Sequence, residues 1–508
     1  MSKWLPDAGE GAVGEQAVAT RIAGYRAVRE QIERSILPLA TSVDGLSFEL
    51  QASLHDLRLR RGGYVVLASD GVERLGQVTD LAADSATTGA EGIGSVLVRL
   101  AKGSGILLDS TGTPFHDASV RPAEAGEVKE WASLRSPARA RLVIGELSSA
   151  PGVPAVLDAG GFDRHTFMCG QSGSGKTYSL GLVLERILAE TTLRVVVLDP
   201  NSDYVGLPRV RADADPQLAA RYAEVTGDIA LWRNDPSGEH PLRLRFADLD
   251  AAAQAAVLGL DPVRDREEYA VLLDLVALQE KGHPLISGVE QLLDAETPAI
   301  RQLGIRAKNL GVLGWSLWSP VARSLVEEVR NPTARCVVVD LGSLDTIQEQ
   351  RIVAEAVLST LWDARLSRTP TLIVVDEAHN ICPGDPSDEL SRLASDKAVQ
   401  IAAEGRKYGL YLLTSTQRPH KVHENVVSQC DNLLLMRMNS HADLGDLRSI
   451  FSFVPAGLIA GATSFRMGQA LVAGKVSPVA TYVQMGSRVS EEGGADVPTT
   501  WAAPRHDH

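Results

Sequence analysis

An uninterrupted phosphate-binding motif constrains this fold more than any other feature of the sequence. Residues 170–177 read GQSGSGKT, which satisfies the P-loop pattern G-x-x-x-x-G-K-[ST]. A short strand-like run, 165–169, precedes the motif, and apolar residues at helical spacing follow it from Leu180 to Leu188. In a loop between a strand and a helix, backbone N–H groups and the helix dipole cradle the phosphates of a nucleotide.

The motif therefore predicts that the chain binds ATP together with Mg²⁺. Lys176 is expected to contact the β- and γ-phosphates, and the Thr177 hydroxyl is expected to hold Mg²⁺. A Gly/Ser-rich turn that matches by chance is the alternative, and the position between a strand and a helix argues against it. The residues expected around the nucleotide are Gly170, Gln171, Ser172, Gly173, Ser174, Gly175, Lys176, Thr177 and Tyr178.

Several continuous apolar runs alternate with helical patterns beyond the motif, which predicts an α/β fold. The runs are 193–198, 336–341, 371–375 and 410–414. Continuous apolar strands alternating with helices indicate a mostly parallel sheet covered by helices on both faces. The last strands are expected at 432–436 and 470–473.

The patterns of apolar and polar residues divide the chain into four regions. Residues 1–44 carry an amphipathic helical arm, and residues 45–150 carry short β-like runs, including Arg141–Leu147, that suggest a small β-barrel for assembly or docking. Residues 151–485 form the predicted ATPase core, in which about 205–335 has a helical pattern and is expected to be an insertion. Residues 486–508 are polar and are expected to form a flexible tail or to lie over a neighbour.

An acidic pair at the end of the 371–375 run has the arrangement of a Walker B strand. Asp376 is expected to bind Mg²⁺, and Glu377 is placed to act as general base on the attacking water. Gln417, at the end of the next strand, can donate to a phosphate and accept from that water. Two solvated carboxylates and an ordinary polar residue at a strand end are the alternatives.

Four further charged residues are candidates for the same chemistry. Asp199 and Asp203 end the neighbouring strand, either beside the nucleotide or at a subunit joint, or as loop caps. Arg406 is the first candidate for an arginine finger that stabilises charge on the transferred phosphoryl group, and Arg437 is the second. An interface salt bridge is the alternative for both arginines.

Composition limits the classes of partner. The net charge of −14 means that any contact with DNA must be local, as in a groove or channel. Four scattered cysteines and the lack of a long apolar run predict a cytoplasmic protein without a membrane anchor. The terminal His506, Asp507 and His508 could chelate a metal, but a frayed terminus explains them better.

Taken together, these motifs resemble those of the HerA/FtsK superfamily of P-loop motor ATPases, and of its HerA branch in particular. The resemblance spans about residues 45–485. It rests on the P-loop and on the motifs DPNSDY at 199–204, VDL at 339–341, VDEAH at 375–379, EGRKYG at 404–409, STQRP at 415–419 and SQCDN at 428–432.

The resemblance implies a RecA-like core, a homo-hexameric ring with ATP between subunits, Arg406 acting in trans, and double-stranded DNA in a central channel. It also implies a partner, either a NurA-type nuclease in DNA end processing or a nuclease or sirtuin-like effector in anti-phage defence. Asp203 departs from the longer Glu common in the family, which puts its role in doubt. Ser391–Lys397 and His420–His423 are candidates for a DNA-gripping loop, although each is better interpreted as an ordinary loop.

The competing hypothesis is an ATP-gated scaffold that assembles and regulates an effector enzyme, with DNA movement secondary. The acidic net charge and the lack of an obvious basic stripe keep this alternative open. A conjugation or secretion ATPase is a third possibility, and the lack of an anchor disfavours it.

Overall fold

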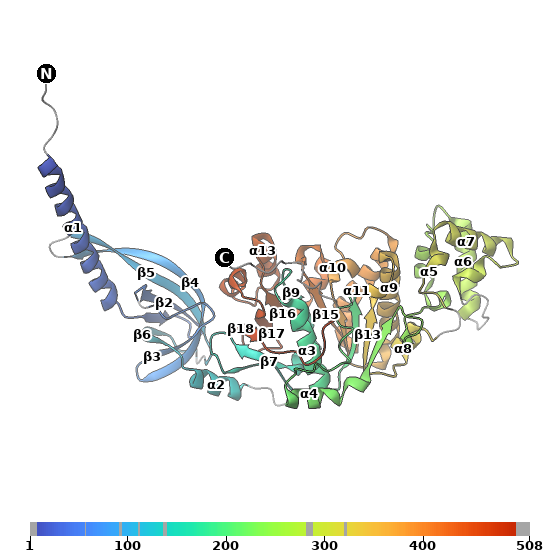
Figure 1. Ribbon diagram of the computed structural model, residues 1–508, viewed down its shortest axis with the longest axis horizontal. Helices are drawn as coiled ribbons and strands as arrows, with labels where there is room; N and C mark the ends of the chain where they lie inside the picture. Colours follow the sequence, from blue (N-terminus) through green and yellow to red (C-terminus); the bar gives the residue numbers. More distant parts are fainter. Residues whose placement is uncertain are drawn as a thin grey trace, which may run out of the picture. The chain divides into compact units, whose positions relative to one another are not determined.

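The computed structural model describes residues 8–55, 57–90, 94–109, 112–135, 140–280, 288–319 and 323–493. These residues form two compact units (Figure 1). The first comprises the chain up to Leu134 with the segments Leu147–Val153 and Pro455–Gly461, and the second comprises Arg135–Glu146, Pro154–Val454 and the chain from Ala462 onward.

The first unit is built on a closed six-stranded barrel in which every strand pairs antiparallel with its neighbours. Alternating side chains point into its core, as in β2, whose residues alternate between exposed and buried. The strands, in the order β1-β2-β5-β4-β3-β6 around the barrel, are β1 (Leu39–Ser42), β2 (Ser47–Ser53), β3 (Tyr64–Ser69), β4 (Val72–Ala90), β5 (Gly94–Leu107) and β6 (Phe115–Pro122).

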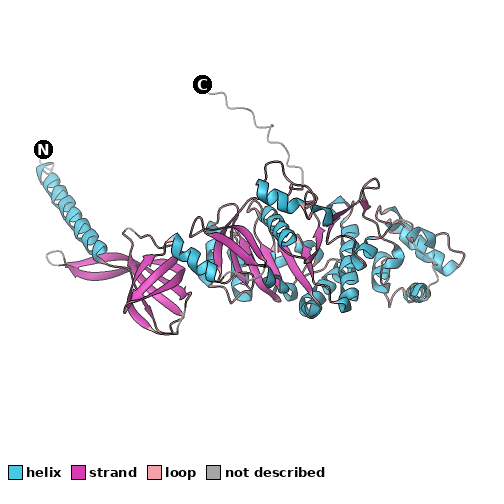
Figure 2. Ribbon diagram, turned by 90° about the horizontal axis from the view of Figure 1, so that it is seen from below, coloured by secondary structure: helices cyan, strands magenta, loops and turns pink. Residues whose placement is uncertain are grey.

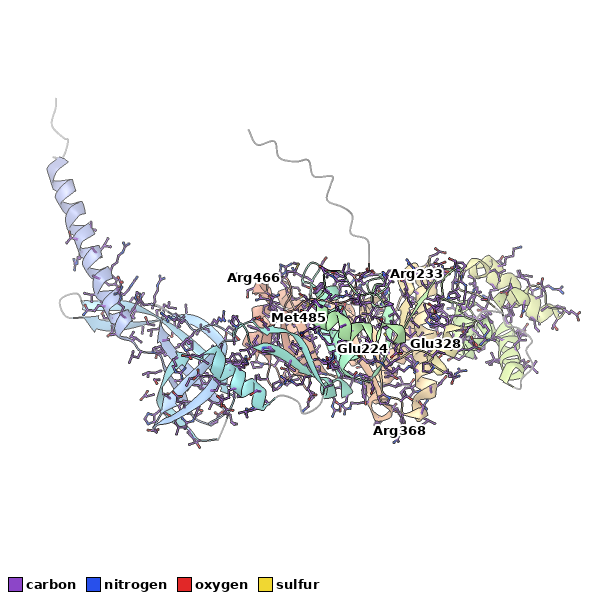
Figure 3. The ribbon with its side chains drawn as sticks, turned by 60° about the horizontal axis from the view of Figure 1, so that its bottom comes forward. Glu224, Arg233, Glu328, Arg368, Arg466 and Met485 are labelled. Atoms are coloured by element: carbon purple, nitrogen blue, oxygen red, sulfur yellow. The ribbon has the colours of Figure 1, made fainter. Side chains whose placement is uncertain are left out.

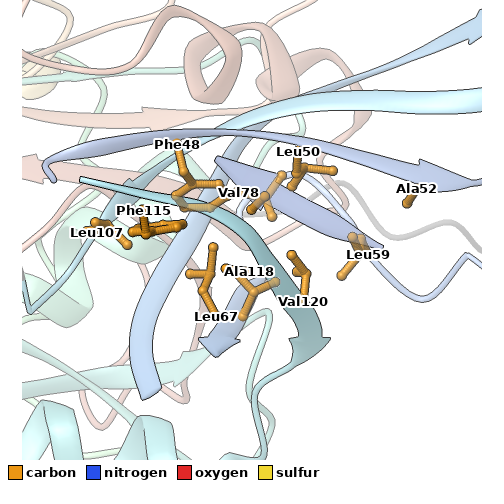
Figure 4. Packing of buried hydrophobic residues seen from close by; sticks show 12 residues of the cluster. Phe48, Leu50, Ala52, Leu59, Leu67, Val78, Leu107, Phe115, Ala118 and Val120 are labelled. Atoms are coloured by element: carbon orange, nitrogen blue, oxygen red, sulfur yellow. The ribbon is translucent and has the colours of Figure 1, made fainter. Parts of the chain in front are cut away.

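The Phe48 ring lies across the inner face of this barrel (Figure 4). A Cβ atom at Gly105 on β5 would lie only 2.1 Å from Cζ of that ring, so only glycine leaves room for it there. Leu67, Val78 and Phe115 belong to the same buried cluster. Side chains of the described strands therefore fill the interior of the barrel.

Three helices belong to this unit: α1 (Ala8–Ser35), α2 (Ala125–Leu134) and α14 (Ala456–Ala460). Along α1, Tyr25, Val28 and Ile32 pack against a buried cluster on β5. The Tyr25 hydroxyl also accepts a hydrogen bond of 2.9 Å from the backbone N–H of Leu97. The amphipathic pattern of this helix is thus explained by packing on its own barrel.

The second unit contains a twelve-stranded sheet, which confirms the predicted α/β class with a large, mostly parallel sheet. The strands from β12 to β16 in the sheet run parallel, and β17, β18, β7 and β8 extend it on one side. Its order is β12-β11-β13-β10-β14-β15-β9-β16-β17-β18-β7-β8. Helices flank the sheet (Figure 2).

The central strands of this sheet are buried along their whole length, as the continuous apolar runs predict. The strands are β7 (Arg141–Leu147), β8 (Pro154–Asp158), β9 (His165–Cys169), β10 (Arg194–Asp199), β11 (Ile229–Arg233), β12 (His240–Pro241), β13 (Cys336–Asp340), β14 (Thr371–Val375), β15 (Leu410–Thr416), β16 (Cys430–Met436), β17 (Gln469–Gly474) and β18 (Thr481–Met485). The helices are α3 (Lys176–Glu190), α4 (Pro216–Ala223), α5 (Ala251–Val257), α6 (Arg266–Glu280), α7 (Pro298–Asn309), α8 (Leu325–Arg330), α9 (Ile347–Asp363), α10 (Ala378–Ile381), α11 (Glu389–Glu404), α12 (Glu424–Val427) and α13 (His441–Ile450).

Three expectations from the sequence are wrong in this unit. Arg141–Leu147 is β7 of the large sheet rather than a barrel strand, because it pairs with β8. The region 205–335 is not simply a helical insertion, because β11 and β12 within it extend the parallel sheet beside β13. Ser391–Lys397 is part of α11 and is not a loop.

The segment Ser487–Gly493, which we call the strap, is likewise packed rather than part of a flexible tail. Arg488 in the strap is fully buried and forms an ion pair with Glu185 of α3, with 3.2 Å between Nε and Oε1. Glu185 also accepts hydrogen bonds of 2.8 Å from the backbone N–H groups of Val489 and Ser490. A buried carboxylate with this many donors fixes the strap along the helix that follows the P-loop.

Candidate nucleotide-binding site

The P-loop lies between β9 and α3, at the carboxyl edge of the parallel strands. Gly173 and Gly175 have φ angles of 71° and 91°, which a residue with a Cβ rarely adopts. Gly175 caps α3 without a side-chain hydrogen bond, so the first N–H groups of the helix remain available to an anion.

Lys176 is buried at the start of α3 and directs its ammonium group at the Walker B pair. Its Nζ lies 2.8 Å from Oδ1 of Asp376, 3.2 Å from Oε1 of Glu377 and 3.0 Å from Oγ of Ser415. Burial alone would lower the pKa of Lys176, but the charges of Asp376 and Glu377 raise it, so the group is a cation here.

Asp376 and Glu377 occupy the first positions after β14, as the Walker B pattern predicts. Asp376 is fully buried, and its Oδ2 accepts a hydrogen bond of 3.3 Å from the Tyr204 hydroxyl. Glu377 has a φ of 42°, a strained conformation for a residue with a side chain. Strain of this kind persists only where the surroundings fix it, and it concentrates at functional sites.

The Glu377 carboxylate is held by three neighbours. Its Oε1 accepts a hydrogen bond of 2.8 Å from Nε2 of Gln417, and its Oε2 lies 3.3 Å from Nδ1 of His379. Burial would raise the pKa of Glu377, but His379, the charge of Lys176 and Gln417 together lower it to about 2. The structure thus brings Gln417, Lys176 and the Walker B pair into one cluster.

Asp199 ends β10, Asp203 lies on the loop that follows, and the two carboxyl groups have different surroundings. Asp199 is fully buried, and its carboxylate accepts backbone N–H groups of Asp203 and Tyr204 at 3.0 and 2.8 Å, which is the role of a loop cap. Burial raises its pKa to about 7. For Asp203, burial and then the charge of Asp376 raise the pKa to about 6.

The two candidate arginine fingers lie at opposite edges of the sheet. Arg437 follows β16 and donates from Nη2 to the backbone oxygen of Gly173 at 3.1 Å, so it contacts the P-loop of its own chain. Arg406 precedes β15 and forms a half-exposed ion pair with Asp431, at 3.0 Å. Because the seven residues of β15 span about 20 Å, Arg406 is that far from the carboxyl edge of its own sheet.

A cavity of about 650 Å³ opens along the P-loop, within the size range of small-molecule sites. Of the predicted residues, Gln171, Ser172, Gly173, Gly175, Lys176, Thr177, Tyr178 and Gln417 line it. The remaining residues that line the cavity were not predicted, and they are Met467, Gly468, Gln484, Met485, Gly486, Ser487 and Glu492. Met485, at the end of β18, is labelled in Figure 3.

The oxygen donors present at the site fit Mg²⁺. Thr177 supplies a hydroxyl that lines the cavity, and Asp376 supplies a carboxylate beside Lys176. Mg²⁺ is commonly held by one or two such groups together with substrate phosphates. In the part of the chain that the structure describes, no group of three or more His, Cys, Asp or Glu could hold a metal ion on its own.

Sequence reasoning missed three residues of this cluster: Tyr204, Ser415 and His379. A usable signal existed for Ser415, because β14 and β15 are parallel with Val375 opposite Thr414, so the residue after each lies at the same level. His379 contacts Thr416 Oγ1 at 3.1 Å. Arg233, labelled in Figure 3, pairs with the buried Asp340 at 3.1 Å further along the same edge.

Of the remaining candidates, His420 is engaged with another side chain. Its Nδ1 lies 2.8 Å from Oδ1 of Asp443, and Lys421 beside it is exposed. The histidines at 506 and 508 lie outside the described residues. None of the described helices is long and apolar enough to cross a membrane.

Comparison with known proteins finds relatives in the same branch that the motifs resemble. Residues 142–292 match the family described as "Helicase HerA, central domain". The chain is 22% identical over 410 residues to the DNA double-strand break repair helicase HerA of Pyrococcus furiosus, covering 67% of this chain and 69% of the relative. It is 23% identical over 388 residues to the protein of the same name from Saccharolobus solfataricus, covering 73% of each. Among solved structures, VirB4 of Thermoanaerobacter pseudethanolicus is similar, with 16% identity, a TM-score of 0.47, and coverage of 69% of this chain and 97% of that one.

Proposed function

We propose that this chain is a HerA-like P-loop ATPase that hydrolyses ATP with Mg²⁺ and uses the cycle to move along or hold double-stranded DNA. The observation that carries the proposal is the convergence of Lys176, Asp376, Glu377 and Gln417 in one cluster, of which Lys176 and Gln417 line the cavity along the P-loop. Relatives named as DNA double-strand break repair helicases support the DNA part.

Each residue of the cluster has a distinct task in this proposal. The P-loop N–H groups and Lys176 bind the β- and γ-phosphates, while Thr177 and Asp376 hold Mg²⁺, which neutralises the charge that develops on the phosphates. Glu377 takes a proton from the attacking water, and Gln417, hydrogen-bonded to Glu377, orients that water against the γ-phosphate.

The position of Arg406 supports assembly into a ring. An arginine about 20 Å from its own carboxyl edge cannot reach its own γ-phosphate. We propose that Arg406 serves the nucleotide of the next subunit of a homo-hexamer, and that Arg437 supports the P-loop within its own subunit. The ion pair of Arg406 with Asp431 would then open on assembly.

We also propose that the protein works in the cytoplasm with a partner nuclease or other effector. The partnership would serve DNA end processing or anti-phage defence. The net charge of −14 supports a second candidate, an ATP-gated scaffold that regulates such an effector while DNA movement is secondary. In the motor, DNA contact must be confined to a local channel.

The experiment that separates the two candidates measures ATPase rate against protein concentration, with and without linear duplex DNA, alongside mass by light scattering. The motor predicts a ring-sized species whose turnover rises with DNA, and a DNA affinity that falls steeply with salt. Lys176→Ala is the control and should abolish turnover. Undiminished hydrolysis by that variant would refute the site, and a ring whose turnover ignores DNA would favour the scaffold.

A further inference from the structure

Besides the P-loop and Gln417, the cavity is lined by the strap and by the β17–β18 hairpin with the two residues before it. Met467, exposed over 71% of its surface, precedes the hairpin, and Glu492 belongs to the strap. The P-loop and Gln417 line the part of the cavity where the phosphates are expected. The nucleoside is therefore expected along the strap and the hairpin. Glu492 therefore places a carboxylate where the nucleoside is expected.

Glu492 is held at the cavity by fixed points on both sides of it. Arg488 anchors the strap in α3, and its backbone N–H donates to the Tyr178 hydroxyl at 2.8 Å. On the other side, the Gly493 N–H donates to the backbone oxygen of Asp203 at 3.0 Å. The Glu492 side chain itself is half exposed, and its cationic neighbour Arg211 is at 3.9 Å, the outer limit of an ion pair.

The chemistry of a carboxylate restricts what it can bind on a nucleotide. An ionised carboxylate only accepts hydrogen bonds, and it is repelled by phosphates. The donors that ATP offers are the two ribose hydroxyls and the amino group of the base. The ribose is nearer to the phosphates, and carboxylate recognition of ribose hydroxyls is established chemistry in other nucleotide-binding folds.

We propose that Glu492 accepts a hydrogen bond from the ribose 2′-hydroxyl of the bound nucleotide, and that Met467 and Tyr178 supply the apolar contacts of the base. This inference rests on the proposed binding of ATP at the P-loop. The strap thereby makes the site selective for ribonucleotides over deoxyribonucleotides. Met467 contributes affinity through a polarisable thioether, without reading the sugar.

The test compares the dissociation constants of ATP and dATP by isothermal titration calorimetry on the full chain. The unaltered protein should bind ATP about tenfold more tightly than dATP, because a hydrogen bond to a charged acceptor is lost. Glu492→Ala should bring the two constants together by weakening ATP while leaving dATP nearly unchanged. Near-constant dATP binding also shows that the variant is folded.

Two matched variants sharpen the result. Glu491→Ala removes the neighbouring carboxylate, which pairs with Arg209 and does not line the cavity, so the preference for ATP should persist. Met467→Ala should weaken ATP and dATP equally.

Three results would overturn the inference: equal binding of ATP and dATP by the unaltered protein, an unchanged preference in Glu492→Ala, or a Glu492→Ala variant that loses discrimination between ATP and ITP instead. If neither nucleotide binds, or Lys176→Ala leaves binding intact, the proposed function itself fails.

Discussion

Replacement of Glu377 by Gln tests the chemistry of the site most directly. The amide keeps the size of the side chain and an oxygen that can accept from Gln417 and Lys176, so the cluster should stay folded around it. It cannot take a proton from water. Since a positioned general base contributes about 10²- to 10⁴-fold, kcat should fall by that factor, a change of about 3–5 kcal/mol in activation free energy.

ATP binding should survive in the same variant. Glu377 competes with the phosphates for Lys176, and the neutral amide competes less, so the dissociation constant of ATP should stay the same or fall. Single-turnover hydrolysis with radiolabelled ATP measures the chemical step, and filter binding measures the retained nucleotide. Glu224→Gln, an exposed carboxylate at the end of α4, is the control.

Two outcomes would refute this reasoning. A kcat within threefold of the unaltered protein would mean that Glu377 is not the base. Loss of ATP binding would mean that the carboxylate is needed to build the site rather than to act in it. The pH profile adds a check, because a pKa of about 2 leaves Glu377 ionised throughout the neutral range, so its titration should not shape kcat between about pH 6 and 9.

Three further predictions concern other elements. Arg406→Ala subunits mixed with Glu377→Gln subunits should regain part of the ATPase activity at mixed interfaces, and verified mixed rings without recovery would exclude a finger in trans. Burial raises the pKa of Glu355 in α9 from 4.5 to about 7, so stability falls as pH rises between these two values, and Glu355→Gln should stabilise the protein by up to about 3 kcal/mol at pH 8 and far less at pH 5, as measured by urea denaturation. Arg488→Met leaves the Glu185 carboxylate buried without its cation and should cost about 3–5 kcal/mol, with weaker ATP binding; an unchanged melting temperature would show that the strap is not anchored there.

The core of the fold could be predicted because its signals are local. The P-loop and the Walker B pair combine a motif with a continuous apolar strand, and both lie where the pattern places them. Strands such as β11 and β18 were missed because five residues with little periodicity do not stand out from a loop. β7 has the right pattern for a strand, but no residue in it specifies which sheet it joins.

The burial of the strap could not be predicted from the sequence. Its polar residues predict an exposed tail, and only the partner of Arg488, 303 residues away on α3, makes them buried. The same holds for Tyr204, whose hydroxyl reaches Asp376 across 172 residues. Contacts of this range depend on the complete fold, and a single sequence offers no pattern that pairs them.

The pairing of Lys176 with Asp376 and Glu377 has a consequence for how the enzyme rests between turnovers. Carboxylates of its own chain neutralise the lysine, so this buried charge does not depend on a nucleotide for its counter-charge. An incoming phosphate must displace those two carboxylates, and departing ADP lets them return. We therefore expect the site to bind nucleotide less tightly and to release ADP more easily, which suits an ATPase that must release ADP in every cycle.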